Sequence, residues 1–396
     1  MERVVGTITR GLRCPIINEG DAIDEIVVDS VLKAMDVEGF KAQDKDIVAI
    51  TESIVARAQG NYASTDAIAS DIKDKFGDHT VGVIFPILSR NRFATLLRGI
   101  AKGAKRIVIM FSYPSDEVGN HLVELDELDE AGVNPWTDVL TLEQFRNHFG
   151  HKKHTFTGVD YIDYYQAIVE ATGVECEIIF SNNPSSILDY TEHVLACDIH
   201  TRERTKRILQ ANGAKTVYSL DNILDQPVDG SGFNEAYGLL GSNKSTEDRI
   251  KLFPNNAQPI VEKIQNTLQT KTERQIEVMV YGDGAFKDPA GKIWELADPV
   301  VSPAFTDGLI GTPNEVKLKY LADNNFKDLD GEELQDAIKK HITNKGDDLV
   351  GEMEAQGTTP RQLTDLIGSL ADLTSGSGDK GTPIVYIQGY FDNYTS

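Results

Sequence analysis

The sequence predicts a mixed α+β fold in which a Rossmann-like α/β segment, residues 79–224, separates two end segments, residues 1–78 and 225–396. In the middle segment, near-continuous apolar strands alternate with helices, which is typical of a parallel sheet covered on both faces. The end segments contain isolated strands, each followed by a loop rich in glycine, hydroxyl or charged residues. With 396 residues, 40% of them hydrophobic, the chain is long enough for two or three domains.

The first end segment begins with an alternating run at residues 4–8, which predicts a short strand, and a loop at residues 11–20. Acidic residues at the start of residues 21–27 predict a helix, because carboxylates favour a helix N-terminus. The β-rich residues 46–50 predict a second strand. Residues 64–76 predict a helix with a hydroxyl residue at its N-cap.

The middle segment is predicted to contain buried strands joined by helices. The predicted strands are residues 81–85, 106–111, 176–180 and 215–218, and the predicted helices are residues 93–102, 142–149, 161–172 and, for the most part, 187–211.

The second end segment is predicted to contain helices at residues 259–268, 332–345 and 360–373. Strands are predicted at residues 275–281 and 384–387, the second of them after a glycine-rich loop.

The composition narrows the class of protein. The formal net charge is −23, and nucleic-acid binding proteins usually carry a basic face, so we expect no nucleic-acid partner. The three cysteines, Cys14, Cys176 and Cys197, fit neither a disulfide framework nor a zinc site. No apolar run reaches the length of a membrane-spanning helix, and the N-terminus lacks the features of a secretory signal. We therefore expect a cytoplasmic protein with no membrane partner.

The glycine-rich loop at residues 375–383 is the sharpest local signal for chemistry. Its glycines permit positive φ, so successive backbone N–H groups can point into one concavity and bind a phosphate, and Lys380 can add a positive charge. The loop lies between a helix and a strand, which differs from both a Walker A loop and a dinucleotide fingerprint. The alternative interpretation is an ordinary flexible connection.

Two further signals follow predicted strands. Asp283 comes after a strand and has glycine on both sides, so it is a candidate ligand for Mg²⁺ or Mn²⁺ or, alternatively, part of an Asp-Gly turn. Glu52, Ser53 and Arg57 follow another strand, where ligand contacts often lie in α/β folds. The alternative there is a helix N-cap beside a solvated arginine.

The middle segment holds charged clusters of less definite meaning. Arg90 and Arg92 follow a buried strand and suit a polyanionic ligand, whereas the arginines of residues 202–207 are better explained as solvated helix residues. Three histidines, His148, His151 and His154, indicate a surface loop, because no cysteine or paired carboxylate joins them in the sequence.

Several segments, in order, resemble the coenzyme F420-0 γ-glutamyl ligase family. Residues 11–21 resemble its opening loop, and residues 45–60 resemble its strand followed by a hydroxyl pair and a lysine, with Glu52 and Ser53 at the pair and Arg57 at the lysine. Residues 280–284 resemble a strand that ends in a metal-binding aspartate.

The resemblance extends to residues 363–383, which match the family's helix and glycine-rich nucleotide loop, and to residues 238–243, which match a third loop. The chain departs from the family at two metal-binding carboxylates, since Leu240 and Ser377 stand at those positions. The carboxylate set of a two-metal site is therefore not reproduced.

The resemblance implies a discontinuous α+β domain built from both chain ends, with the Rossmann-like α/β domain inserted, and a homodimer. It implies that GTP phosphorylates an anionic small-molecule acceptor and that L-glutamate then forms an amide with it. Asp283 and Arg57 would be catalytic, and Asp283 and Asp379 would bind Mg²⁺ or Mn²⁺. The implied nucleotide-binding residues are Leu12, Arg13, Glu52, Ser53, Arg57, Asn243, Gly376, Ser377, Gly378, Lys380 and Gly381.

Other functions stay open at this point. The chain can be a ligase for a different acid, or a nucleotide- or metabolite-binding regulatory protein without catalysis, which the residues Leu240 and Ser377 would favour. It can also be an enzyme whose activity lies in the middle segment, around Arg90 and Arg92. The sequence does not decide between GTP and ATP or identify the acceptor.

Overall fold

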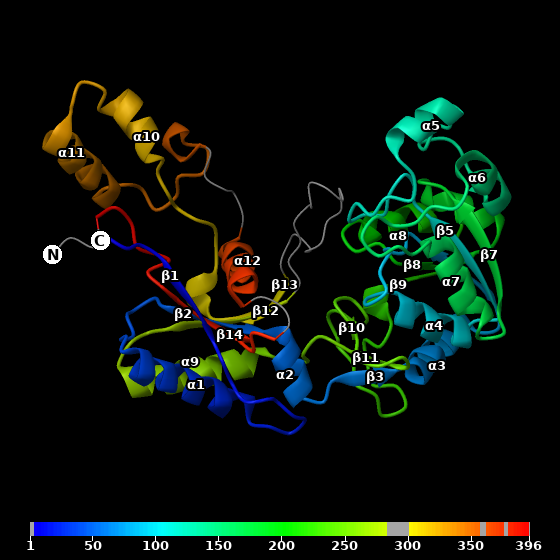
Figure 1. Cartoon of the computed structure of the whole chain (residues 1–396), viewed down its shortest axis with the longest axis horizontal. Helices are drawn as coiled ribbons and strands as arrows, with labels where there is room; N and C mark the ends of the chain where they lie inside the picture. Colours follow the sequence, from blue (N-terminus) through cyan, green and yellow to red (C-terminus); the bar gives the residue numbers. More distant parts are fainter. Residues whose placement is uncertain (1–3, 283–300, 357–361, 376–378, 396) are drawn as a thin grey trace.

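The computed structural model describes residues 4–282, 301–356, 362–375 and 379–395. Within these residues the strands form a five-stranded, a six-stranded and a three-stranded sheet. Figure 1 shows the three-stranded sheet between the two larger ones. The mixed α+β class predicted from the sequence is therefore confirmed.

The five-stranded sheet combines strands from both ends of the chain, in the order β1-β14-β2-β12-β13. β2 and β12 are parallel, and the other neighbouring pairs are antiparallel. The strands are β1 (Ile8–Leu12), β14 (Ile384–Gln388), β2 (Ile47–Thr51), β12 (Glu277–Gly282) and β13 (Val301–Phe305).

Helices cover both faces of this sheet. α1 (Ile23–Glu38) and α9 (Gln258–Thr272) pack on one face, against the side chains of Val48, Ile50 and Val280. α12 (Leu363–Ser375) packs on the other face, against Ala49 and Tyr281. Successive residues of a strand point to opposite faces, so these continuous apolar strands are buried on both sides.

The six-stranded sheet draws all its strands from one stretch of chain, in the order β6-β7-β5-β4-β8-β9. All neighbouring pairs are parallel except β6 with β7. Its apolar side chains divide between two core clusters, so both faces are buried. The strands are β4 (Thr80–Ile84), β5 (Arg106–Phe111), β6 (Leu140–Thr141), β7 (Glu175–Phe180), β8 (His193–Ala196) and β9 (Thr216–Ser219).

Seven α-helices are described between residues 52 and 211. They are α2 (Glu52–Ala58), α3 (Thr65–Phe76), α4 (Ala94–Gly103), α5 (Leu125–Ala131), α6 (Leu142–Phe149), α7 (Tyr161–Glu170) and α8 (Arg202–Ala211). α3 packs closely on α4. The close approach requires glycine at position 103, since a Cβ there would come within 2.4 Å of the Ala69 carbonyl oxygen. The Ser64 hydroxyl caps α3 by accepting from the Ala67 N–H.

The three-stranded sheet connects the two larger regions. It consists of β10 (Asn243–Lys244), β11 (Arg249–Lys251) and β3 (Tyr62–Ser64), all antiparallel. The helices α10 (Leu318–Tyr320) and α11 (Gly331–Thr343) lie apart from the sheets, around a small cluster of Leu321, Ile338 and Ile342 (Figure 1).

Most predicted elements are present, and three predictions are wrong. The first strand, β1, lies at Ile8–Leu12 rather than at residues 4–8, because these are the residues that pair with β14. Residues 187–211 are not mostly helical, since β8 inserts a short buried strand there. The acidic run between the strand at residues 106–111 and the helix at residues 142–149, for which the sequence predicts a loop, contains α5, which begins with a capping box between Glu124 and Glu127.

Candidate functional site

The predicted site segments meet at one edge of the five-stranded sheet. The parallel strands β2 and β12 end together, with Thr51 opposite Tyr281. β14 starts at the same edge, because Ile384 lies opposite Ile50, and β1 ends there, with Leu12 opposite Ile384. We call this the carboxyl edge: the ends of β1, β2 and β12 and the start of β14.

A buried ion pair lies at the carboxyl edge. Glu52, the first residue of α2, is 3% exposed, and Lys251 at the end of β11 is 7% exposed. The Lys251 Nζ lies 2.7 Å and 2.5 Å from the two carboxylate oxygens of Glu52. Glu52, predicted from the sequence to bind nucleotide, is therefore held by a lysine from a segment 199 residues away.

Glycines let the backbone approach this ion pair. A Cβ at Gly282 would come within 2.4 Å of the Glu52 Cγ and 2.9 Å of the Phe253 ring. A Cβ at Gly241 would come within 2.1 Å of the same ring. Asn243, a predicted nucleotide contact, lies on β10 opposite Lys251. Segments from three parts of the chain therefore lie close together at the end of β12.

The other predicted residues of the N-terminal segments lie around this point in different environments. Leu12 is buried in the apolar core beneath α1, whereas Arg13 is exposed just past β1. Ser53 is exposed on α2. Arg57 is exposed too, and its Nε donates to the Ile17 carbonyl, which ties α2 to the loop after β1.

The glycine-rich loop is fixed at both ends to the same edge. The Tyr281 hydroxyl donates to the Ser375 Oγ over 3.2 Å, and the Thr382 hydroxyl donates to the Ser375 carbonyl over 2.8 Å. The Thr51 N–H donates to the Pro383 carbonyl over 3.0 Å. Burial, with a contribution from Asp372, raises the pKa of Tyr281 to about 12, so its hydroxyl stays protonated.

Part of the predicted site lies outside the described residues, namely Asp283, Gly376, Ser377 and Gly378. Asp379, Lys380 and Gly381 are described, and all are exposed. Gly381 has a φ of +65°, a conformation that glycine adopts without strain.

The described residues do not complete a metal site at the carboxyl edge. Leu240 is buried in an apolar cluster and offers no ligand atom, and the carboxylate of Glu52 is neutralised by Lys251. Asp379 adds a single exposed carboxylate. The binding of Mg²⁺ or Mn²⁺ by Asp283 and Asp379 stays a prediction.

One group elsewhere has the spacing of metal ligands, and it corrects the expectation that no paired carboxylate joins the histidines. Ligand atoms of His151, Asp160 and Asp163 lie within 4.8 Å of one another. However, the Arg146 guanidinium bonds both oxygens of Asp160 at 2.9 Å and 3.0 Å and also Asp163 at 2.6 Å. A bidentate guanidinium already supplies the positive charge there, so the group is explained as an ion-pair cluster.

At the ends of the parallel strands of the six-stranded sheet, the carboxylates of the buried Asp116 and the half-buried Glu117 join neighbouring loops. Asp116 accepts from the Leu88 N–H over 2.8 Å, and burial raises the pKa of its carboxyl. Glu117 accepts the backbone N–H groups before α8, at residues 199–201. The loop that carries Arg90 and Arg92 contacts β10 through Asn91, whose carbonyl accepts from a backbone N–H over 2.7 Å.

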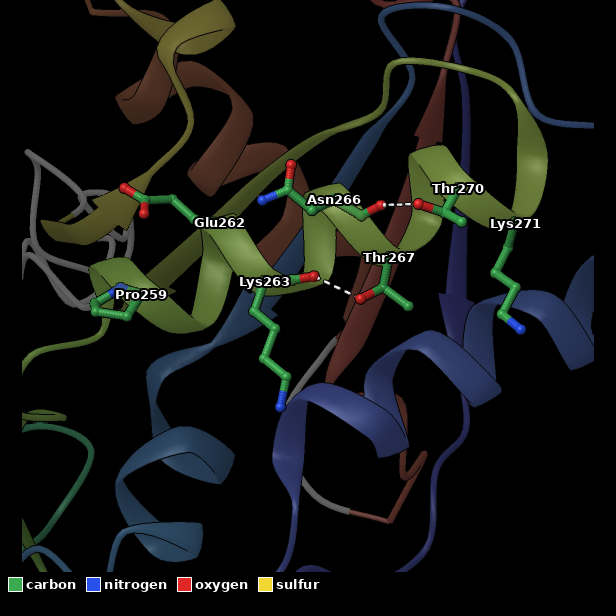
Figure 2. A pocket seen from close by; sticks show the side chains of 7 residues that line it. All are labelled: Pro259, Glu262, Lys263, Asn266, Thr267, Thr270 and Lys271. Carbon is green, nitrogen blue, oxygen red and sulfur yellow. Dashed lines mark hydrogen bonds between the residues drawn. The ribbon is translucent and has the colours of Figure 1, made fainter.

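Two hollows in the described residues lie away from the carboxyl edge. The larger, of about 530 Å³, is an open depression along the outer side of α9 (Figure 2), and two of its threonines, Thr267 and Thr270, bond back to carbonyls of the same helix. The smaller, of about 230 Å³, lies at the start of β12 beside Glu277. Neither contains a residue predicted to bind nucleotide.

Lys251 is the site residue that the sequence analysis missed. It stands in the short run Arg249–Lys251 just before Leu252 and Phe253, which are both buried. A lysine flanked by buried apolar residues in a strand points to a buried charge that needs a partner. That signal was available, but the partner, Glu52, was too far away in the sequence to be identified.

The comparisons with known proteins identify a family for the chain. A sequence profile of the family described as F420-0:Gamma-glutamyl ligase matches residues 11–389, which is nearly the whole chain. No curated protein matches the chain. In the described residues, no helix is both long and apolar enough to cross a membrane.

Proposed function

This chain belongs to the F420-0:γ-glutamyl ligase family, and we propose that it is a GTP-dependent ligase that joins L-glutamate to a carboxylate acceptor. The family is one of ligases, and its profile covers both end segments and the segment between them. The acceptor is an anionic small molecule, either the one that names the family or a different acid.

The observation that carries the proposal is the meeting of distant segments at the carboxyl edge. The ends of β1 and β2, the β10–β11 pair and the flanks of the glycine-rich loop come from both halves of the chain and converge there. In α/β proteins, ligands commonly bind outside the carboxyl ends of parallel strands. Arg13, Arg57 and Lys380 are exposed cations from three of these segments, which suits a polyphosphate.

The proposed reaction has two steps. A carboxylate oxygen of the acceptor attacks the γ-phosphorus of GTP, the bond to the β-phosphate oxygen breaks, and an acyl phosphate and GDP form. The amino nitrogen of L-glutamate, after losing a proton, then attacks the acyl carbon, and inorganic phosphate leaves as the amide forms. Cations and loop N–H groups would hold the phosphate oxygens and stabilise the charge that moves between them.

We also propose that both chain ends form one discontinuous domain, into which the Rossmann-like segment is inserted. The five-stranded sheet, whose strands lie between residues 8 and 51 and between residues 277 and 388, supports this division. The homodimer and the cytoplasmic location belong to the same proposal, and both rest on the resemblance and the composition rather than on contacts.

A second function is favoured by two observations at the site. Leu240 offers no metal ligand, and Glu52 is neutralised by Lys251, so the chain can be a nucleotide-binding regulatory protein that does not turn its ligand over. The two functions differ in one measurable property, which is the consumption of GTP in the presence of an acid and L-glutamate.

The test is calorimetric titration of the full chain with GTP, GDP and ATP, with and without Mn²⁺. We expect guanine nucleotides to bind in a metal-dependent way, and Asp283→Asn to weaken that binding. Asp74→Asn, on the exposed side of α3, is the matched control and should bind as wild type does. Absence of binding by any nucleotide would contradict both functions, and binding without turnover would favour the second.

A further inference from the structure

The ion pair between Glu52 and Lys251 is unusual because both charges are buried. Burial of two charges costs several kcal/mol per ion, and replacement of such a pair by apolar residues is often neutral or stabilising. The contribution of the pair to stability therefore does not explain why two charges are buried here. A role in binding a ligand at the site explains it better.

The ammonium of Lys251 keeps unused capacity for a hydrogen bond. It has three N–H donors, and the described contacts account for two of them, both directed to the carboxylate of Glu52. No other described residue accepts from its Nζ. A buried donor without an acceptor is rare, since an unmade hydrogen bond costs about 1–3 kcal/mol.

A second polar group nearby is also unsatisfied. The Ser242 Oγ is buried, the residue being 2% exposed, and no described residue bonds to it. Ser242 directly precedes Asn243, which lies opposite Lys251 in the β10–β11 pair. Two neighbouring segments of one small sheet therefore each hold a buried polar group with unfilled bonding capacity.

The ion pair lies directly beside the carboxyl edge. Glu52 follows Thr51 at the end of β2, and the backbone N–H of Thr51 bonds the segment just after the glycine-rich loop. Gly282 at the end of β12 approaches Glu52 so closely that a Cβ would not fit. Lys251 is thus the buried cation beside the edge at which the predicted nucleotide segments meet.

We infer that Lys251 binds a phosphate oxygen of the nucleotide and that Glu52 is a positioning residue, which holds the ammonium at the carboxyl edge. The inference rests on the proposed function. It explains why an acidic residue stands where the resemblance places a hydroxyl: the carboxylate acts through Lys251 and does not itself contact the anionic ligand. A charge-assisted bond to a phosphate is about twice as strong as a neutral one.

The test uses a variant in which both charges are replaced, Glu52→Leu with Lys251→Met. Apolar residues of similar size leave no buried charge unpaired, so this variant should be as heat-stable as wild type. We expect it to bind GTP and GDP at least about tenfold more weakly in calorimetry, since a hydrogen bond to a charged group is lost. Its affinity for guanosine, which has no phosphate, should be unchanged.

The matched control is Asp24→Asn with Lys263→Met, which removes another lysine–carboxylate pair, on the surface between α1 and α9. It should bind GTP as wild type does. If the variant with Glu52→Leu and Lys251→Met does not fold, Glu52→Gln with Lys251→Met keeps the shape of residue 52 and takes its place. Lys251→Arg, which keeps the charge, should retain more GTP affinity than either neutral variant.

The outcomes separate the inference from the proposed function. A stable neutral variant that binds GTP as tightly as wild type would overturn the inference and leave the ligase standing. So would an unchanged GTP affinity with a raised KM for the acid acceptor, because Lys251 would then bind the acceptor. A wild-type protein that binds no nucleotide would overturn the proposed function, and the inference with it.

Discussion

The two edges of the five-stranded sheet bury carboxylates in different ways. At the carboxyl edge, Glu52 is bound by the charged side chain of Lys251. At the opposite edge, which we call the amino edge, Asp46 precedes β2 and Glu277 begins β12, and both are almost fully buried. Neutral groups supply the described bonds to both of these carboxylates.

Each of the amino-edge carboxylates accepts hydrogen bonds from several uncharged groups. The Tyr386 hydroxyl donates to the Asp46 Oδ2 over 2.6 Å, and Gln388 bonds the same atom over 3.2 Å. Glu277 accepts from the Thr306 hydroxyl and from the side chain of Gln265. Burial raises the pKa of Asp46, although these bonds act in the opposite direction.

The difference teaches which edge can serve an anionic ligand. Neutral donors add no positive charge to a carboxylate, and no described residue bonds to the buried Asp46 Oδ1, so the amino edge stays negative or takes up a proton. At the carboxyl edge, the charge of the Lys251 ammonium is balanced by Glu52, but one of its three N–H donors has no described acceptor. Two buried acids with similar exposure can therefore serve different purposes, and their partners rather than their burial reveal which.

The largest expected effect on stability comes from removing one member of the ion pair at the carboxyl edge. Lys251→Met removes the buried ammonium that balances the carboxylate of Glu52, so we expect a loss of about 3–5 kcal/mol in the free energy of unfolding, measured by denaturant titration. Lys263→Met, on the exposed face of α9, should leave it unchanged within error. A stability loss for Lys251→Met no larger than that of the control would show that the pair is not buried as described.

A smaller effect is expected from two matched glycines, one at each edge. A Cβ at Gly282 would lie 2.4 Å from the Glu52 Cγ, and one at Gly308 would lie 2.3 Å from the Glu277 Cδ. Either alanine substitution should destabilise the fold by about 1–3 kcal/mol through overcrowding. Only Gly282→Ala should also weaken GTP binding in calorimetry. Weakened binding by Gly308→Ala would remove the functional distinction between the edges.

The smallest effect is a pH dependence at the amino edge. Because the pKa of Asp46 is raised in the folded state, the folded protein binds this proton more tightly than the unfolded chain does. The group's contribution to stability is thus fully present below about pH 3.8, its ordinary pKa, and is lost as the pH rises through the raised value. Comparing unfolding curves of wild type and Asp46→Asn between pH 4 and pH 7 should show this loss in wild type alone. A difference that instead grows in favour of wild type with rising pH would mean that the bonds from Tyr386 and Gln388 outweigh burial.

Much of the fold could be predicted because its strands carry their own signal. Residues 106–111 form a continuous apolar run, and they form β5 with the predicted bounds. β8 escaped prediction because four residues between helical patterns are too few for periodicity to identify. β10 and β11 have only two and three residues, and their stability depends on pairing with each other and with β3.

The candidate site was predictable only where its chemistry is local. A glycine-rich loop and a hydroxyl after a strand can be recognised from neighbouring residues, and Ser53 and Lys380 were named in this way. The pairing of Glu52 with Lys251 depends on tertiary contacts between distant segments, which no spacing rule encodes. For the same reason the sequence did not show that Leu12 faces the core rather than the loop beside it.

The interior place of β14 in its sheet has a consequence for how the chain acquires its structure. Among the described strands, β1 pairs with β14 alone. Ile8 therefore has no strand partner until Gln388 has been synthesised. The six-stranded sheet, whose strands all lie between Thr80 and Ser219, needs no such delay. During synthesis the middle of the chain can therefore fold while the ribosome is still at work, and the sheet that carries the carboxyl edge closes last. Chains cut short before Ile384 should expose an unpaired β1 and the open edge of β2 to other chains, and aggregate rather than accumulate as partly active protein.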